Sequence, residues 1–160
     1  MRPSVRGLLF DSADRLILFR RTVPGRAVYF SVPGGHVEDG DAGLEGTLRR
    51  ELLEELGATV ERVTPLTTLA YPWRGRIKVQ HVYGCRLRTM DPALRHGPEV
   101  DDPARGDYEV VRLAADPAEI ISRPIVPPAL AGYLAARIEL LPALIGSGPA
   151  SPTDDPGRAR

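Results

Sequence analysis

Residues 33–58 read PGGHVEDGDAGLEGTLRRELLEELGA, a run of glycines and acidic residues that leads into a strongly periodic segment. Residues 44–56 carry leucine at every fourth position, the apolar repeat of a helix that packs on a core; the four are Leu44, Leu48, Leu52 and Leu56. Gly57 follows the last leucine, where a left-handed glycine commonly ends a helix. The stretch therefore predicts a turn at Pro33-Gly34-Gly35 and then one amphipathic helix.

The same helix carries three closely spaced carboxylates, Glu51, Glu54 and Glu55. At about 100° per residue they span an arc of roughly 100°, which we expect to face away from the leucines. Like charges at this spacing cost about 0.2–0.5 kcal/mol per pair, and such local conflicts often mark function. Carboxylate oxygens are the ligands that Mg²⁺ prefers, and the cation would offset the repulsion. A solvated acidic face, with Arg50 paired to Glu54, is the alternative.

The flanking sequence predicts a single α/β domain over residues 1–145. Short apolar runs separated by polar breaks indicate strands at residues 5–10, 15–20, 27–32, 60–69, 77–87 and 108–113. Loops are predicted at residues 23–26, 70–76 and 90–106, and helices at 117–121 and 127–141. Residues 146–160 lack periodicity and are rich in Gly, Pro, Ser and Asp, which predicts a disordered tail.

Composition narrows the class of protein. The formal net charge of +0 argues against a surface built to bind a nucleic acid polymer. No apolar run reaches the length of a membrane span, and the N-terminus has no secretory pattern, so we expect a cytoplasmic protein without membrane contact. Cys85 is the only cysteine, which excludes an intrachain disulfide and a cysteine-based zinc site. Lys78 is the only lysine among 21 basic residues.

Residues 35–58 resemble the Nudix box, G-x5-E-x7-R-E-U-x-E-E-x-G-U, in which U is a bulky apolar residue. The positions that match are Gly35, Arg50, Glu51, Leu52, Glu54, Glu55 and Gly57. Three positions depart from the pattern. Asp41 replaces a glutamate, eight residues instead of seven separate it from Arg50, and Ala58 is small. The departures leave the role of Asp41 open.

The resemblance implies an α/β/α sandwich with a central mixed β-sheet. It also implies divalent-metal-dependent hydrolysis of a diphosphate linkage in a nucleoside-diphosphate-linked compound, such as an NTP or an ADP-ribose-like molecule. Glu51, Glu54 and Glu55 would bind Mg²⁺ or Mn²⁺, and Arg50 would orient a glutamate, so these four residues form the expected catalytic set. Gly34 and Gly35 would let the backbone approach metal or phosphate.

Further site residues are expected outside the box. Nudix proteins commonly recruit one more acidic residue, and we favour Glu109 over Glu99 and Asp101 because it lies on a predicted strand. Arg20 and Arg21, at the end of a predicted strand, are candidates to bind phosphate, with solvated edge charges as the alternative. Tyr71 and Trp73 are candidates to stack a nucleobase, with packing as the alternative.

Two other interpretations stay open beside a small-molecule hydrolase. The chain would be a non-hydrolytic Nudix domain that senses a nucleotide or a partner, or a structural acidic helix that resembles the box by chance. Pro72 lies near the position of a proline that marks ADP-ribose-specific members, at a slightly shorter spacing. The resemblance also allows a homodimer, although no feature of the sequence indicates an interface.

Overall fold

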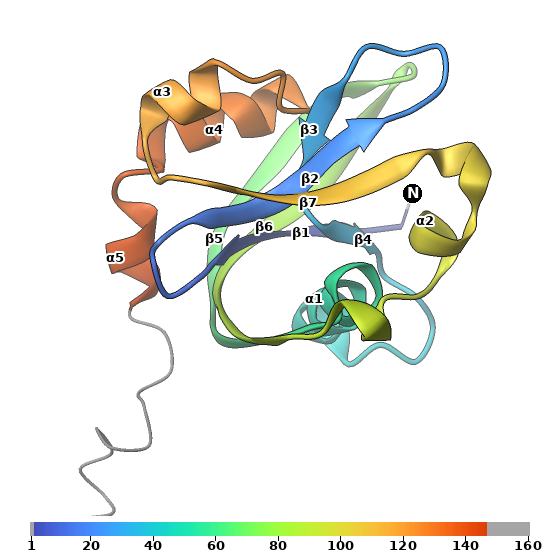
Figure 1. The fold of residues 1–160 in the computed structure, drawn as a ribbon, viewed down its shortest axis with the longest axis horizontal. Coiled ribbons are helices and arrows are strands. Elements are labelled where there is room, and N and C mark those ends of the chain that lie inside the picture. Colours follow the sequence, from blue (N-terminus) through green and yellow to red (C-terminus); the bar gives the residue numbers. More distant parts are fainter. Residues whose placement is uncertain (1, 147–160) are drawn as a thin grey trace, which may run out of the picture.

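The computed structural model describes residues 2–146, in which helices cover both faces of a mixed β-sheet (Figure 1). The strands are β1 (Ser4–Phe10), β2 (Leu16–Thr22), β3 (Tyr29–Ser31), β4 (Gly34–His36), β5 (Ala58–Trp73), β6 (Arg76–Met90) and β7 (Asp107–Leu113). The helices are α1 (Gly43–Leu56), α2 (Pro98–Asp101), α3 (Pro117–Ile121), α4 (Pro128–Arg137) and α5 (Leu141–Ile145). Helix α1 lies on one face and α3, α4 and α5 on the other. The predicted α/β/α sandwich with a mixed sheet is confirmed.

The central strand, β1, has one neighbour on one side at its start and a different neighbour on that side at its end. The strand order is β3-β2-β1-β6-β5, with β4 beside β1 and β7 beside β2, and only β1 and β6 run parallel. Residues 4–6 of β1 pair with β4, whereas Leu9 and Phe10 pair with β2. The sheet therefore opens between β4 and the β2–β3 pair, and side chains at this opening line two cavities.

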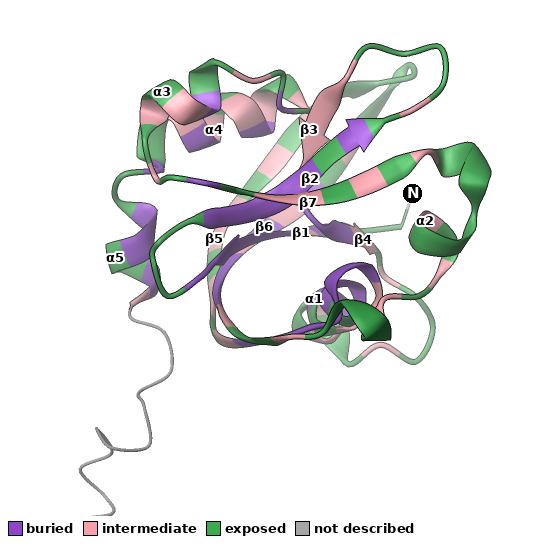
Figure 2. Ribbon diagram, in the orientation of Figure 1, coloured by how far each residue is buried: buried purple, intermediate pink, exposed green. Residues whose placement is uncertain are grey.

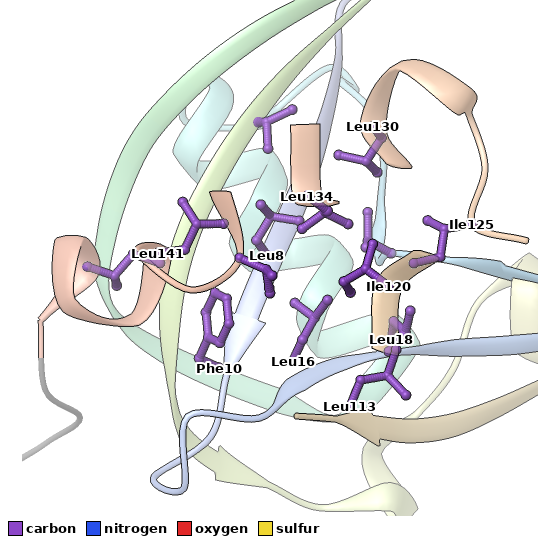
Figure 3. Close-up of a cluster of buried hydrophobic side chains, with 14 residues drawn as sticks. Leu8, Phe10, Leu16, Leu18, Leu113, Ile120, Ile125, Leu130, Leu134 and Leu141 are labelled. Carbon is purple, nitrogen blue, oxygen red and sulfur yellow. The ribbon is translucent and has the colours of Figure 1, made fainter. Parts of the chain in front are cut away.

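Strands β1 and β2 are buried along most of their length (Figure 2). Alternation along them sends apolar side chains into two separate cores. Toward α3, α4 and α5, Leu8 and Leu18 join a cluster that includes Leu130 and Leu134 (Figure 3). Toward α1, the sheet contributes Val5, Leu9, Ile17 and Phe19, which pack with Leu48, Leu52 and Leu56. Three of the four leucines in the predicted repeat are therefore buried, as expected, and Leu44 is partly buried against the same core.

The predicted loop at residues 70–76 is wrong. Strands β5 and β6 continue through it as a long hairpin whose turn is Arg74-Gly75, both with positive φ, as a two-residue hairpin turn requires. Pro72 does not interrupt the pairing because β5 is an edge strand, where a missing N–H is tolerated. The predicted turn at residues 33–35 is also corrected, since Gly34 and Gly35 belong to β4 and pair with β1.

The C-terminal helix predicted at residues 127–141 is two helices, α4 and α5. Pro142 has no N–H to donate to Ile138, and its ring disfavours a continuous helix through this point. The predicted loop at residues 90–106 contains α2 and two short 3₁₀ turns, each opening on a proline. Of the predicted tail, residues 147–160 lie outside the described residues. Within residues 2–146, no helix has both the length and the apolar character needed to cross a bilayer.

Asp11, in the turn between β1 and β2, is a buried carboxylate outside helix α1. It accepts hydrogen bonds from Arg112 Nη1 at 2.8 Å, from Arg15 Nε at 2.9 Å, and from the backbone N–H groups of Ala13 and Arg15. Burial raises the pKa of Asp11, but the hydrogen bonds outweigh burial, so the pKa lies below its ordinary value. This carboxylate therefore ties β7 to the β1–β2 turn.

We expect Asp11→Asn to lower the free energy of unfolding by about 2 kcal/mol at pH 7, because the amide turns a donor toward the arginines. Since the folded pKa lies below the unfolded one, the carboxylate stabilises the fold above about pH 4. That contribution is lost as the pH falls toward the folded pKa. Denaturant unfolding of both proteins at pH 7 and pH 3 measures the effect, with exposed Asp39→Asn as control. An equal difference at both pH values would contradict this account.

Candidate active site

Helix α1 buries two of the three closely spaced glutamates. Glu51 is 5% exposed and Glu55 is 4% exposed, so the expectation that the glutamates face away from the leucines is wrong. Glu55 comes seven residues after fully buried Leu48 and is therefore only about 20° from it around the helix. Glu54 lies at the margin, with 19% of its side chain exposed. The carboxylates thus border the core.

Strand β4 passes directly over these carboxylates. The Gly34 N–H donates to Glu55 Oε2 at 3.3 Å. A Cβ atom on Gly35 would lie 2.1 Å from Glu51 Oε1, so only glycine allows the backbone to come this close. The two glycines predicted from the sequence are therefore brought together with Glu51 and Glu55.

Arg50 connects the glutamates to Asp41. Its Nε and Nη2 atoms donate to the two carboxylate oxygens of Asp41 at 2.8 and 3.0 Å. Its Nη1 atom donates to Glu51 Oε1 at 3.1 Å and to Glu54 Oε1 at 3.4 Å. Hydrogen bonds from Arg50, and next from the Glu38 N–H, hold the pKa of the Asp41 carboxyl well below its usual range. Asp41 is thus an anchor for Arg50 despite its shorter side chain and the extra residue.

The positive charges beside the buried glutamates do not offset the effect of burial. Burial raises the pKa of Glu51 to about 7; Arg50 opposes this shift and Glu54 adds to it. Burial also raises the pKa of Glu55 well above its ordinary value. Among the described residues, Glu51 Oε2 is buried without a hydrogen-bond partner. An oxygen that is buried, acidic and unpaired fits a divalent cation.

The acidic side chains do not form a closed cage. Within residues 2–146, no three His, Cys, Asp or Glu side chains converge as a ready set of metal ligands. Mg²⁺ usually keeps several waters and substrate oxygens in its shell, so a few carboxylates on one side suffice. The donor set fits a cation that is shared between protein and substrate.

A cavity of about 390 Å³ adjoins the glutamates. Gly34, Gly35 and Glu55 line one side, and the remaining lining includes four arginines, namely Arg6, Arg21, Arg26 and Arg105. A second cavity of about 320 Å³ shares Arg6 and Arg26 with the first and is lined also by Tyr71 and Trp73. The predicted aromatic residues and Glu55 therefore line adjoining cavities that share two arginines.

The structure does not bring Arg20 and Glu109 to the glutamates. They pair with each other at 3.7 Å and line a cavity at β7, where 61% of the Glu109 side chain is exposed. Glu99 on α2 lines this cavity and also the one beside Glu55. The segment before α2 is attached to α1, since the His96 N–H donates to the Glu54 carbonyl at 2.8 Å.

Several polar residues that line the second cavity were not expected from the sequence, among them Arg6, Arg26, Lys78 and Gln80. The two on β6 had a detectable signal. Lys78 and Gln80 alternate with Val79 and therefore lie on the same face of β6 as Val82. Val82 is buried in the core beneath α4. Polar side chains at inward positions of a strand depart from the usual pattern. For Arg6 and Arg26 the surrounding sequence offers no such cue.

These features define an α/β/α protein in which the glutamates of α1 lie beside a cavity lined by four arginines. A family model described as NUDIX domain matches residues 1–127. The chain therefore belongs to the Nudix hydrolase family, whose members hydrolyse diphosphate linkages in nucleotide-like compounds. No match was found among curated proteins.

Solved structures share the fold at low sequence identity. A NUDIX hydrolase from Nitrosomonas europaea has a TM-score of 0.69 and 17% identity, with 92% of each chain covered. The NUDIX domain of Shewanella oneidensis NrtR, in complex with ADP ribose, has a TM-score of 0.65 and 18% identity, with 88% of each chain covered. A MutT NUDIX hydrolase from Burkholderia pseudomallei has a TM-score of 0.59 and 22% identity, covering 88% of this chain and 98% of that one.

Proposed function

We propose that the protein hydrolyses a diphosphate linkage in a nucleoside-diphosphate-linked substrate, using Mg²⁺ or Mn²⁺ held by Glu51, Glu54 and Glu55. The observation that carries this proposal is the unpaired Glu51 Oε2, buried on α1 beside an arginine-rich cavity. When bound, the cation supplies charge neutralisation at the diphosphate and a coordinated, acidified water. A metal-binding face next to an anion-binding face is the arrangement that such a substrate needs.

The protein's own groups would orient the reactants. Arg50, held by Asp41, fixes the carboxylates of Glu51 and Glu54 through its hydrogen bonds. The glycine backbone of β4 leaves room for phosphate oxygens beside Glu55. Arginine forks are well suited to bidentate phosphate contacts, and Arg26 lines both cavities.

We also propose Glu99, in place of Glu109, as the additional acidic residue. It lines the cavity beside Glu55 and is close enough to raise the pKa values of Glu51 and Glu55. Its partner Arg105, at 3.3 Å, lines the same cavity. Glu99 is thus placed to receive a proton or to add a metal ligand.

The substrate class is tested with a panel that contains ADP-ribose, nucleoside triphosphates and dinucleoside polyphosphates, assayed with Mg²⁺, Mn²⁺ or EDTA. The complex of the Shewanella NrtR domain with ADP ribose makes that compound the first choice. We expect metal-dependent release of a nucleoside monophosphate or phosphate from at least one member. Binding without turnover would instead indicate a nucleotide sensor, and neither binding nor turnover would contradict both functions.

Glu54→Gln is the variant for this assay, and we expect kcat/KM to fall at least about 100-fold, since a metal ligand is lost. Glu45→Gln is the matched control, because it makes the same chemical change at an exposed position of the same helix, where Glu45 pairs with Arg49. Equal activity of the two variants would remove Glu54 from the proposed site.

A further inference from the structure

Gln80 is a buried amide that the protein itself does not satisfy. It is 1% exposed, and its Oε1 atom has no hydrogen-bond partner among residues 2–146. Its backbone is held on both sides, by Ser4 of β1 and Leu69 of β5, so the side chain projects from a fixed position in the sheet. Burying an amide oxygen without a hydrogen bond destabilises a fold, which makes a bound ligand the expected partner.

This amide lines the cavity that contains Tyr71 and Trp73. Lys78, two residues before it, lines the same cavity and has its Nζ atom 4.8 Å from the centre of the Trp73 ring. Gln80 is the only side-chain amide in the chain, and Lys78 is the only lysine. The cavity thus combines aromatic walls, positive charge and one hydrogen-bond acceptor that is free.

The cavity also communicates with the proposed catalytic groups. Arg6, Arg26 and Ser31 line both it and the cavity beside Gly34, Gly35 and Glu55. Arg6 Nη1 donates to the Val32 carbonyl at 3.2 Å, which places its guanidinium at the junction. A ligand that spans both cavities would have its anionic part near the glycines and its aromatic part near Gln80.

We propose that Gln80 determines base specificity, with Oε1 accepting a hydrogen bond from an amino or ring N–H group of the substrate's nucleobase. The inference rests on the proposed function for the location of the diphosphate. A planar heterocycle fits the Tyr71 and Trp73 walls, and an amide offers an adjacent acceptor and donor, the pairing that bases present at their edges. Arg6 and Arg26, which line both cavities, would offset the negative charge of the phosphates of that nucleotide.

Gln80→Leu tests the proposal by calorimetry with AMP, GMP and inorganic pyrophosphate, none of which needs to be hydrolysed. We expect the variant to bind the preferred mononucleotide at least 10-fold more weakly, and pyrophosphate within twofold of the parent. Thermal unfolding should be unchanged or shifted upward, because an unsatisfied buried oxygen is removed. His81→Ala, the next residue on β6, whose imidazole contacts Thr68, is the control and should bind as the parent does.

A second measurement removes the donor from the ligand. If AMP is preferred, purine riboside 5′-monophosphate, which lacks the amino group, should bind the parent at least 10-fold more weakly than AMP. Gln80→Leu should bind these two ligands equally. If GMP is preferred, the same comparison is made between GMP and IMP. Unchanged discrimination in the variant, or an equal loss for pyrophosphate, would overturn the assignment. Since these are binding measurements, Gln80-dependent discrimination without hydrolysis would refute only the proposed function.

Discussion

Glu51→Gln is expected to lower kcat/KM by about 10³-fold, which corresponds to about 4 kcal/mol of transition-state stabilisation. The glutamine keeps an oxygen that can accept from Arg50 Nη1, now 3.1 Å from Glu51 Oε1, so the local shape is preserved. What disappears is the negative charge at the buried Oε2 atom, the feature that fits a divalent cation. The effect should exceed that of Glu54→Gln because Glu54 is less buried.

Stability should move in the opposite direction. Burial raises the pKa of Glu51, and the negative charges of the neighbouring Glu54 and Glu99 raise it further. Removing this charge relieves repulsion, so the free energy of unfolding without metal should stay equal or rise by up to about 1 kcal/mol. Steady-state kinetics, Mn²⁺ calorimetry and denaturant unfolding test the three expectations. Weakened Mn²⁺ binding with full activity, or more than a tenth of the parent's activity with normal Mn²⁺ binding, would contradict this role.

The helix could be predicted from sequence because its determinants are local. The leucine repeat and Gly57 define α1 to within one residue at its start, and Gly57 does adopt the left-handed conformation. The predicted orientation of the glutamates is wrong because charged side chains are usually exposed, whereas Glu51 and Glu55 are buried. Glu55 is buried because β4 crosses over it and the Gly34 N–H reaches it, a contact between segments 21 residues apart.

The residues that line the two cavities could not be predicted from the sequence either, because they come from segments far apart in the chain. Arg6 on β1 and Arg26 in the β2–β3 loop meet only because β1 changes partners from β4 to β2 along its length. Likewise, residues 70–76 contain proline and glycine and so suggested a loop, whereas pairing across β5 and β6 extends the hairpin. That extension carries Tyr71 and Trp73 to the cavity. Long-range pairing, rather than local propensity, determines which side chains share the site.

Alanine substitutions at the two adjacent glycines of β4 are expected to have different effects, a loss of stability at Gly34 and a loss of activity at Gly35. A Cβ on Gly34 would lie 2.1 Å from the Val5 carbonyl oxygen and 3.0 Å from Arg6 Cα, both backbone atoms of β1, and Gly34 has a φ of +155°. The clash and the conformational strain together should cost about 4 kcal/mol. Because one kcal/mol lowers Tm by about 2–4 °C in a domain of this size, Gly34→Ala should lower Tm by about 10 °C.

Gly35→Ala should fold but lose activity. The added Cβ would meet Glu51 Oε1 at 2.1 Å and Glu51 Cδ at 2.5 Å, the far end of a flexible side chain that can rotate away. The displaced carboxylate would leave Arg50 and the proposed metal site, so kcat/KM should fall by about 100-fold or more, a loss of about 3 kcal/mol. The cost in stability should stay near 1 kcal/mol, since no backbone atom has to move.

Thermal unfolding and kinetics of both variants separate these outcomes, with Gly25→Ala as control. Gly25 also has a positive φ, but nothing lies within 4 Å of the position that an added Cβ would take, so it reports backbone strain alone. If Gly35→Ala lost stability to the same extent as Gly34→Ala, the glycine would serve the strand rather than the site. If Gly35→Ala retained full activity, catalysis would not depend on the present position of the Glu51 carboxylate. A loss of activity in Glu51→Gln would then need an explanation other than the loss of a metal ligand at this position.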